Sequence, residues 1–299
     1  MITLRHHLLT IVAVFLALAA GIVLGGGPLS DVGPAVTAAG IDKGRAETPS
    51  ASSAKGDFDE KWVAALTGPI LGGRLTDRSV VLVTVPGADE QVVTDLASQV
   101  EAAGGAVTAR YALGADLVDP AQKSLVDTLG SQLLTQQAKG VVPAEASTYD
   151  RIGQLIGLAV ASKEADGEDV TRRTRAIADS ISGAGLMELP SEVDRRAPLV
   201  LLVLGDDADD EGSDAILAGL VDGLASQATG VVVAGTLADG GSGQLGRLRA
   251  TPTAARVATV DGVDALAGRA AAVMALGRSL TTPGGSFGAS GTDGAVPLG

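Results

Sequence analysis

The fold class of this chain is decided by two apolar runs, Leu199-Val-Leu-Leu-Val-Leu204 and Val231-Val-Val233. Neither run alternates with polar residues, so each predicts a strand buried on both faces, as strands are in a parallel sheet covered by helices. A strand with one exposed face would instead show a polar residue at every second position. We therefore predict an α/β fold with a largely parallel, Rossmann-like sheet.

Further strands and helices extend from these runs in both directions. The predicted strands lie at residues 80–85, 106–113, 198–204, 230–235 and 256–260. Apolar residues at helical spacing predict helices at residues 89–103, 120–137, 146–161, 168–182, 213–227 and 263–280. The first two strands and the helix between them form a β-α-β unit, whereas the middle third of the chain shows no obvious strand.

Composition limits the class of protein. The 299 residues are 46% hydrophobic but only 2% aromatic, which suits a sizeable core of small aliphatic side chains. A net charge of −13 without a long basic run argues against a nucleic-acid partner.

Catalytic chemistry is limited by missing residue types. The chain has no cysteine, and its two histidines are His6 and His7 near the N-terminus. A Ser-His-Asp triad, a thiolate nucleophile and a His or Cys metal site are therefore impossible in the predicted domain. A carboxylate or lysine enzyme using Asp206 or Lys163 is an alternative that no motif supports, so we expect no enzyme activity, no catalytic residues and no cofactor.

An apolar run at residues 8–24 predicts a single-pass transmembrane helix. Its seventeen residues give a length of roughly 25 Å, close to the thickness of the hydrocarbon core. Arg5 before the run and Asp31 after it predict a signal anchor with a cytoplasmic N-terminus and an extracytoplasmic domain. Ala17 and Ala19 also fit the A-x-A pattern of a cleaved signal peptide, but the apolar run continues to Leu24, which favours an uncleaved anchor.

One face of this predicted helix carries small residues at four-residue steps. They are Ala13, Ala17, Gly21 and Gly25. Small residues let two helices approach closely in a membrane, so this face predicts a membrane helix contact and a possible homo-oligomer. An Ala-rich segment also produces such spacing by chance.

The chain divides into five predicted parts. A cytoplasmic N-terminus (1–7) and the transmembrane anchor (8–24) precede a flexible linker (25–56) rich in Gly, Pro, Ala, Ser and Thr. An extracytoplasmic α/β domain (57–282) follows, beginning with Phe58, Trp62 and Leu66 at helical spacing. A Gly-rich tail (283–299) is expected to be loosely held.

A glycine-rich segment, Gly241-Ser-Gly243-Gln-Leu-Gly246, satisfies the G-x-G-x-x-G string of dinucleotide-binding proteins, and Asp261 follows about twenty positions later. The segment lies several residues beyond its strand, and Pro252 would end the following helix early. We therefore predict a flexible surface loop here. A nucleotide-binding enzyme stays a third alternative.

Carboxylates gather after the strand that ends at Leu204. They are Asp206, Asp207, Asp209, Asp210, Glu211 and Asp214. Open α/β sheets bind ligands at this position, but the resemblance to a calcium loop fails because the twelfth position is Ala218 instead of Glu. The simpler prediction is that these acids cap the helix that begins near Ser213.

Soft metal ligands are scarce, because beyond the initiator only Met187 and Met274 carry a thioether. Each lies in an apolar pattern, which predicts a place in the core. The metal ligands, if the chain has any, are therefore unknown from the sequence.

Three blocks of the sequence resemble the actinobacterial copper transport protein B (MctB) family. The first is Ile2-Thr-Leu-Arg-His-His7, which leads into Ala13-Val-Phe-Leu-Ala-Leu-Ala19 and Gly21-Ile-Val-Leu-Gly25. The others are Thr259-Val-Asp-Gly-Val-Asp264 and, after Ala275-Leu-Gly-Arg-Ser-Leu280, Gly284-Gly-Ser-Phe-Gly288. Their order and spacing fit the family over essentially the whole chain.

The resemblance implies a cell-envelope copper transporter that serves copper homeostasis by limiting copper accumulation, with a location in the outer membrane possible. It supplies no metal ligands at named positions, so copper as a partner is implied by the family only. The charged coiled coil usual in the family has no counterpart at residues 30–56, which lack heptads. The alternative is a non-enzymatic extracytoplasmic interaction module that binds an envelope protein in cell-wall or division control.

Overall fold

The computed structural model describes residues 51–298. The predicted transmembrane helix at 8–24 and its contact face of Ala13, Ala17, Gly21 and Gly25 lie outside the described residues. Among the helices that are described, none combines the length and the apolarity needed to cross a membrane. The residues from Lys55 onward form one compact unit.

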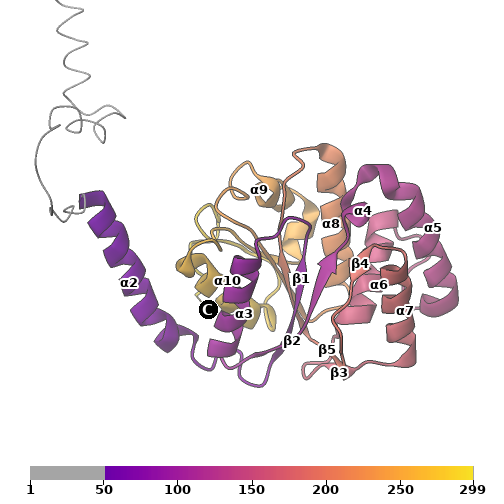
Figure 1. Ribbon diagram of the computed structural model, residues 1–299, viewed down its shortest axis with the longest axis horizontal. Coiled ribbons are helices and arrows are strands. Elements are labelled where there is room, and N and C mark those ends of the chain that lie inside the picture. The colour runs from indigo at the N-terminus through magenta and orange to yellow at the C-terminus, as the bar shows by residue number, and fades with distance from the viewer. Residues whose placement is uncertain (1–50, 299) are drawn as a thin grey trace, which may run out of the picture. The chain divides into compact units, whose positions relative to one another are not determined.

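A seven-stranded sheet forms the centre of this unit, with the strand order β4-β2-β1-β6-β7-β8-β9 (Figure 1). All neighbouring strands pair in parallel except β4, which pairs antiparallel with β2. The strands are β1 (Ser79–Thr84), β2 (Ala106–Leu113), β4 (Met187–Glu188), β6 (Leu199–Val203), β7 (Gly230–Ala234), β8 (Ala258–Val260) and β9 (Ser286–Phe287). The predicted α/β class and its largely parallel sheet are confirmed.

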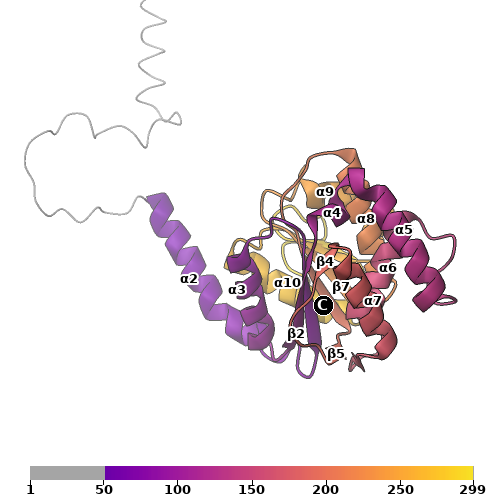
Figure 2. The same cartoon turned by 45° about the vertical axis from the view of Figure 1, so that its right-hand side comes forward.

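Helices cover both faces of the sheet (Figure 2). One face packs against α3 (Glu90–Ala102) and α10 (Leu266–Ser279). The other is covered by α5 (Lys123–Leu133), α6 (Thr148–Val160), α7 (Arg172–Gly183) and α8 (Glu211–Ala225). Along β6, Leu199 and Leu201 face the first core while Val200 and Leu202 face the second. Both faces of β6 are buried, which explains why residues 199–204 are apolar without alternation.

Short elements complete the chain between these helices and strands. The helical ones are α4 (Ala115–Val118), α9 (Gln244–Arg249) and the single turns η1 (Pro120–Gln122), η2 (Leu134–Ala138) and η3 (Pro252–Ala255). The helix predicted at 120–137 is thus divided into η1, α5 and η2. The middle third also contains β3 (Glu168–Asp169) and β5 (Arg195–Arg196), which pair antiparallel in a separate small sheet.

Glycines allow α6 and α8 to pack closely. A Cβ atom added at Gly153 would lie 2.5 Å from the carbonyl oxygen of Leu220, and one added at Gly223 would lie 2.4 Å from that of Asp150. Real Cβ atoms do not approach a backbone oxygen so closely, so only glycine fits at these positions.

The predicted linker ends earlier than expected. Helix α2 (Ala51–Leu71) includes residues 51–56, which were assigned to the flexible linker, and the rest of that linker lies outside the described residues. The helical spacing of Phe58, Trp62 and Leu66 is confirmed, but Phe58 and Trp62 are 65% and 57% exposed. Apolar spacing therefore predicted the helix but not which face it buries.

The prediction of a loosely held tail is wrong for residues 286–290. Ser286 and Phe287 form β9, and Phe287 is 4% exposed. Arg249 donates hydrogen bonds to the Phe287 carbonyl at 2.7 Å and the Ser290 hydroxyl at 2.9 Å. The high glycine content of this segment suggested flexibility. In the structure the same glycines permit close packing against the sheet.

Candidate functional site

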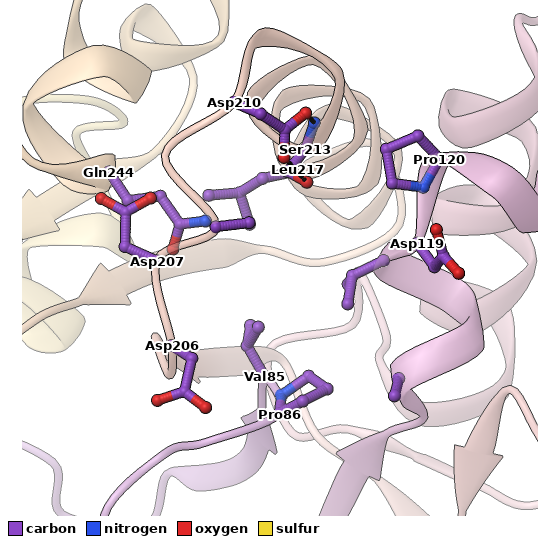
Figure 3. Close-up of a pocket in the computed structure, with 13 residues that line it drawn as sticks. Val85, Pro86, Asp119, Pro120, Asp206, Asp207, Asp210, Ser213, Leu217 and Gln244 are labelled. Atoms are coloured by element: carbon purple, nitrogen blue, oxygen red, sulfur yellow. Dashed lines mark hydrogen bonds between the residues drawn. The ribbon is translucent and has the colours of Figure 1, made fainter.

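A cavity of about 400 Å³ opens at the carboxyl ends of β1 and β6 (Figure 3). The chain leaves β1 toward β2 on one side and leaves β6 toward β7 on the other, so the connections diverge at this point. Such a topological switch point is where open α/β sheets place their ligands. We call this cavity the switch-point crevice. Its lining comprises Val85, Pro86, Ala115, Val118, Asp119, Pro120, Asp206, Asp207, Ala208, Asp210, Ser213, Leu217 and Gln244.

The loops after β1 and β6 lie against each other at the base of the crevice. The Asp206 amide donates to the Pro86 carbonyl at 2.9 Å, and a Cβ atom at Gly205 would lie 1.9 Å from that same oxygen. Gly87 has a φ of +85°, and its missing side chain leaves room for the Asp206 carboxylate. Glycine is required at both positions, and the contact holds Asp206 at the crevice.

Asp210 caps helix α8. Its carboxylate accepts hydrogen bonds from the Ser213 amide at 2.9 Å and the Ser213 hydroxyl at 2.6 Å. These two bonds lower the pKa of Asp210 from its ordinary value. The predicted capping role is confirmed for this member of the acidic cluster.

Arg247 on α9 binds three other members of the cluster. Its guanidinium contacts Asp207 at 2.5 Å, Asp214 at 2.6 Å and Asp209 at 3.4 Å. Burial acts to raise the pKa of Asp207, but hydrogen bonds from Arg247 and the Asp209 amide outweigh it and hold that pKa below its ordinary value. Three carboxylates thus share one cation, and negative charge is left unbalanced beside the crevice.

Two carboxylates of the crevice have no cationic partner among the described residues. Asp119 accepts a hydrogen bond from the Ala121 amide at 2.8 Å, which caps η1, and it forms no ion pair there. The Asp206 side chain forms neither a hydrogen bond nor an ion pair within the described part of the chain. The crevice therefore carries charge that its own residues do not neutralise.

Gln244 contributes a buried amide to the same crevice. The residue is 5% exposed, and its Oε1 atom has no hydrogen-bond partner within residues 51–298. Burying an amide oxygen without a hydrogen-bond donor costs about 1–3 kcal/mol of folding free energy. Such an atom is therefore a candidate to accept a hydrogen bond from a ligand. Sequence reasoning missed Gln244 although it lies inside the G-x-G-x-x-G string, because that string directs attention to its glycines.

The G-x-G-x-x-G string was predicted to be a flexible surface loop. Its loop is folded instead of flexible, since the Gly246 amide donates to the Asp239 carbonyl at 3.0 Å and the Gly241 amide to the Ser290 hydroxyl at 2.9 Å. Asp261 is fully buried and pairs with Arg249 at 2.9 Å, so it cannot reach a ribose.

The other candidate residues are not brought together. Lys163 lies near the amino end of β6, where its carbonyl accepts a hydrogen bond from Thr229, whereas Asp206 follows the carboxyl end. Met187 and Met274 are 1% and 2% exposed, which confirms their predicted place in the core. Within residues 51–298, no group of three or more His, Cys, Asp or Glu side chains could hold a metal ion.

The fold and the crevice define a doubly wound α/β protein whose switch point is lined by carboxylates. Residues 1–298 match the family model described as "Copper transport outer membrane protein, MctB". The chain therefore belongs to the MctB family, as its N-terminal, Thr259–Asp264 and Gly284–Gly288 blocks suggested.

Curated relatives agree over nearly the whole chain. The "Copper transporter MctB" of Mycobacterium tuberculosis (strain ATCC 25618 / H37Rv) is 26% identical over 291 residues. The protein of the same name from Mycobacterium leprae (strain TN) is 28% identical over 302 residues. Each alignment covers 92% of this chain and 92% of the relative.

Proposed function

We propose that this protein is a membrane-anchored envelope protein that contributes to copper homeostasis by limiting copper accumulation, without being an enzyme. The observation that carries the proposal is the family match over residues 1–298. Relatives aligned over 92% of both chains carry the name copper transporter, which supports a copper-related role for the whole chain.

The side-chain chemistry of the domain favours an indirect effect on copper, without direct binding of the metal. Cu(I) prefers thiolate, thioether and imidazole ligands. The chain has no cysteine, its histidines are His6 and His7, and Met187 and Met274 are buried in the core. The crevice offers only oxygen and amide groups. The domain is therefore proposed to act on copper content by binding another molecule.

The proposed topology places residues 1–7 in the cytoplasm, residues 8–24 in the membrane and the α/β domain outside the cytoplasm. A single helix encloses no channel, so conduction would need several copies, which the face of Ala13, Ala17, Gly21 and Gly25 would bring together. Because the chain has no cysteine, single cysteines can report its topology. A membrane-impermeant maleimide on intact cells should label Glu145→Cys and spare Thr3→Cys, and the reverse pattern would contradict this topology.

The copper role is tested in a deletion strain. Cellular copper, measured by mass spectrometry at low and raised external copper, should increase on deletion and return to normal when the full chain is restored. Unchanged copper content in the deletion strain would refute the proposal.

Exposed apolar side chains on α2 favour a second candidate, an extracytoplasmic interaction module for cell-wall or division control. Phe58, Trp62 and Ile70 are 65%, 57% and 43% exposed. Neighbouring exposed aromatics are typical of protein-binding surfaces. A deletion strain with normal copper but abnormal septa, rescued by the full chain and not by its Phe58→Ser, Trp62→Ser variant, would support this function instead.

A further inference from the structure

We propose that the switch-point crevice binds a primary ammonium group carried on an aliphatic stem. The inference goes beyond the copper role and does not depend on it. It rests on two observations within residues 51–298: Asp119 and Asp206 have no cation beside them, and the Oε1 atom of Gln244 has no hydrogen-bond donor.

The charge of the crevice selects for a cation. Asp206 has no hydrogen-bond or ionic partner among the described residues, and Asp119 has only the Ala121 amide. Nearby, Asp207, Asp209 and Asp214 share the single guanidinium of Arg247. A phosphate or carboxylate ligand would be repelled by this arrangement, although switch points of this fold often hold nucleotides.

Gln244 independently points to a ligand that donates hydrogen bonds. The residue is 5% exposed and lines the crevice, and its Oε1 atom has no donor within residues 51–298. Figure 3 shows Gln244 and Asp207 on the side of the crevice opposite Asp119 and Pro120. An ammonium group has three N–H donors and no acceptor, which suits a crevice whose polar groups are carboxylates and an amide oxygen.

The remaining wall of the crevice is apolar and suits the stem of such a ligand. It is formed by Val85, Pro86, Val118, Pro120 and Leu217. A volume of about 400 Å³ accommodates a small molecule or one long side chain. Bare metal ions fit less well, because no cluster of three ligating side chains exists among the described residues.

This ligand chemistry has two possible sources, a free diamine or a lysine side chain of a polypeptide. The probes for the full chain in detergent micelles are 1,5-diaminopentane and the tripeptide Gly-Lys-Gly, each titrated by calorimetry. Their matched controls are 1,5-pentanediol, which keeps the stem but removes the charge, and the tripeptide acetylated at Nζ. Tighter binding of the diamine identifies the free amine as the source, and tighter binding of the tripeptide identifies the polypeptide.

Two variants connect binding to the crevice. Asp206→Asn should weaken binding by about tenfold, because it removes a charge-assisted hydrogen bond. Gln244→Leu should weaken it by about fivefold, the worth of one neutral hydrogen bond. Glu145→Gln, which changes an exposed acid outside the crevice, is the matched control and should bind as the unaltered chain does.

The proposal is overturned if neither probe binds, if the controls that lack the ammonium on the aliphatic stem bind equally well, or if Asp206→Asn leaves affinity unchanged. Should Gln244→Leu fail to fold, Asp206→Asn still decides, since the exposed side chain of Asp206 has no hydrogen bond or ion pair to lose within residues 51–298 and asparagine has nearly the same size.

Discussion

The guanidinium of Arg249 lies 2.9 Å from the carboxylate of Asp261, and the two side chains are 10% and 0% exposed. Asp261 also accepts a hydrogen bond from the Ser290 amide at 2.9 Å, and Arg249 donates to the Phe287 carbonyl. This buried pair thus joins α9, the end of β8 and the C-terminal segment. Two of the three sequence blocks that suggested the family meet at this pair.

Loss of Arg249 should destabilise the domain strongly. Arg249→Met leaves the Asp261 carboxylate buried without a cation, which costs about 3–5 kcal/mol of unfolding free energy. Urea unfolding followed by circular dichroism measures this change. Limited proteolysis should also cut residues 283–298 sooner in the variant.

The matched control is Arg256→Met, whose partner Asp222 lies in a more exposed pair, with side chains 45% and 33% exposed. Exposed pairs contribute about 0–1 kcal/mol, so this variant should unfold nearly as the unaltered chain does. Equal destabilisation by the two substitutions would contradict the role given to the buried pair.

Close packing of α6 against α8 predicts that Gly223→Ala destabilises the protein. The added Cβ would lie 2.4 Å from the Asp150 carbonyl oxygen, and separating the helices should cost about 1–3 kcal/mol. Thermal unfolding measures the loss. Gly183→Ala on α7 is the control, since no heavy atom lies within 4 Å of its added Cβ, and it should be neutral or stabilising by up to about 1 kcal/mol. A neutral Gly223→Ala would show that the helices can separate freely.

The phenol of Tyr111 should ionise only at unusually high pH, and the free energy of unfolding should fall as it ionises. Burial raises the pKa of Tyr111 to about 12, although the nearby charge of Arg175 acts to lower it. Because the unfolded side chain ionises near 10, the stabilisation is complete below that pH and is lost as pH rises to 12. The loss amounts to roughly 3 kcal/mol of unfolding free energy.

Ultraviolet absorbance of tyrosinate can follow this titration. The chain has two tyrosines, so Tyr149→Phe leaves Tyr111 as the single signal. The variant should titrate near 12 when folded and near 10 in concentrated urea. A folded titration near 10 would show that Tyr111 is accessible to water.

Removal of Arg247 should loosen the loop after β6. Without its guanidinium, Asp207, Asp209 and Asp214 repel one another, so Arg247→Ala should speed hydrogen exchange of amides at residues 206–214 by about tenfold while leaving β6 protected. In the unaltered chain the pKa of Asp207 is lowered. The ionised Asp207 therefore stabilises the fold at pH values above the ordinary pKa of an aspartate, and this stabilisation is lost as the pH falls through the lowered pKa. Unchanged exchange would mean that the loop is held by its other contacts.

Local sequence signals predicted much of the secondary structure. The apolar runs located β6 and β7, and the strand predicted at 106–113 coincides with β2. The helix predicted near Ser213 is α8, capped by Asp210 as expected. These signals succeed because the period of side-chain burial is set by the element itself.

Short elements escaped prediction for a physical reason. Strands β4 and β9 have two residues each, too few to show a period, and they exist because a neighbouring strand offers free hydrogen-bonding groups. Segment 283–290 looked flexible because it is rich in glycine, yet Arg249 and Asp261 bind it to the sheet.

The sequence by itself determined the α/β class, the buried parallel strands, the lack of His and Cys chemistry beyond residue 7, and the family. Only the tertiary structure decided which acids cap and which pair within residues 51–298. Asp119, Asp206 and Gln244 lie far apart in the chain and line one crevice only when β1 and β6 become neighbours. Packing likewise leaves the buried Oε1 atom of Gln244 without a hydrogen-bond donor among residues 51–298. Whether a polar atom is satisfied depends on every segment packed around it, and no local pattern encodes that.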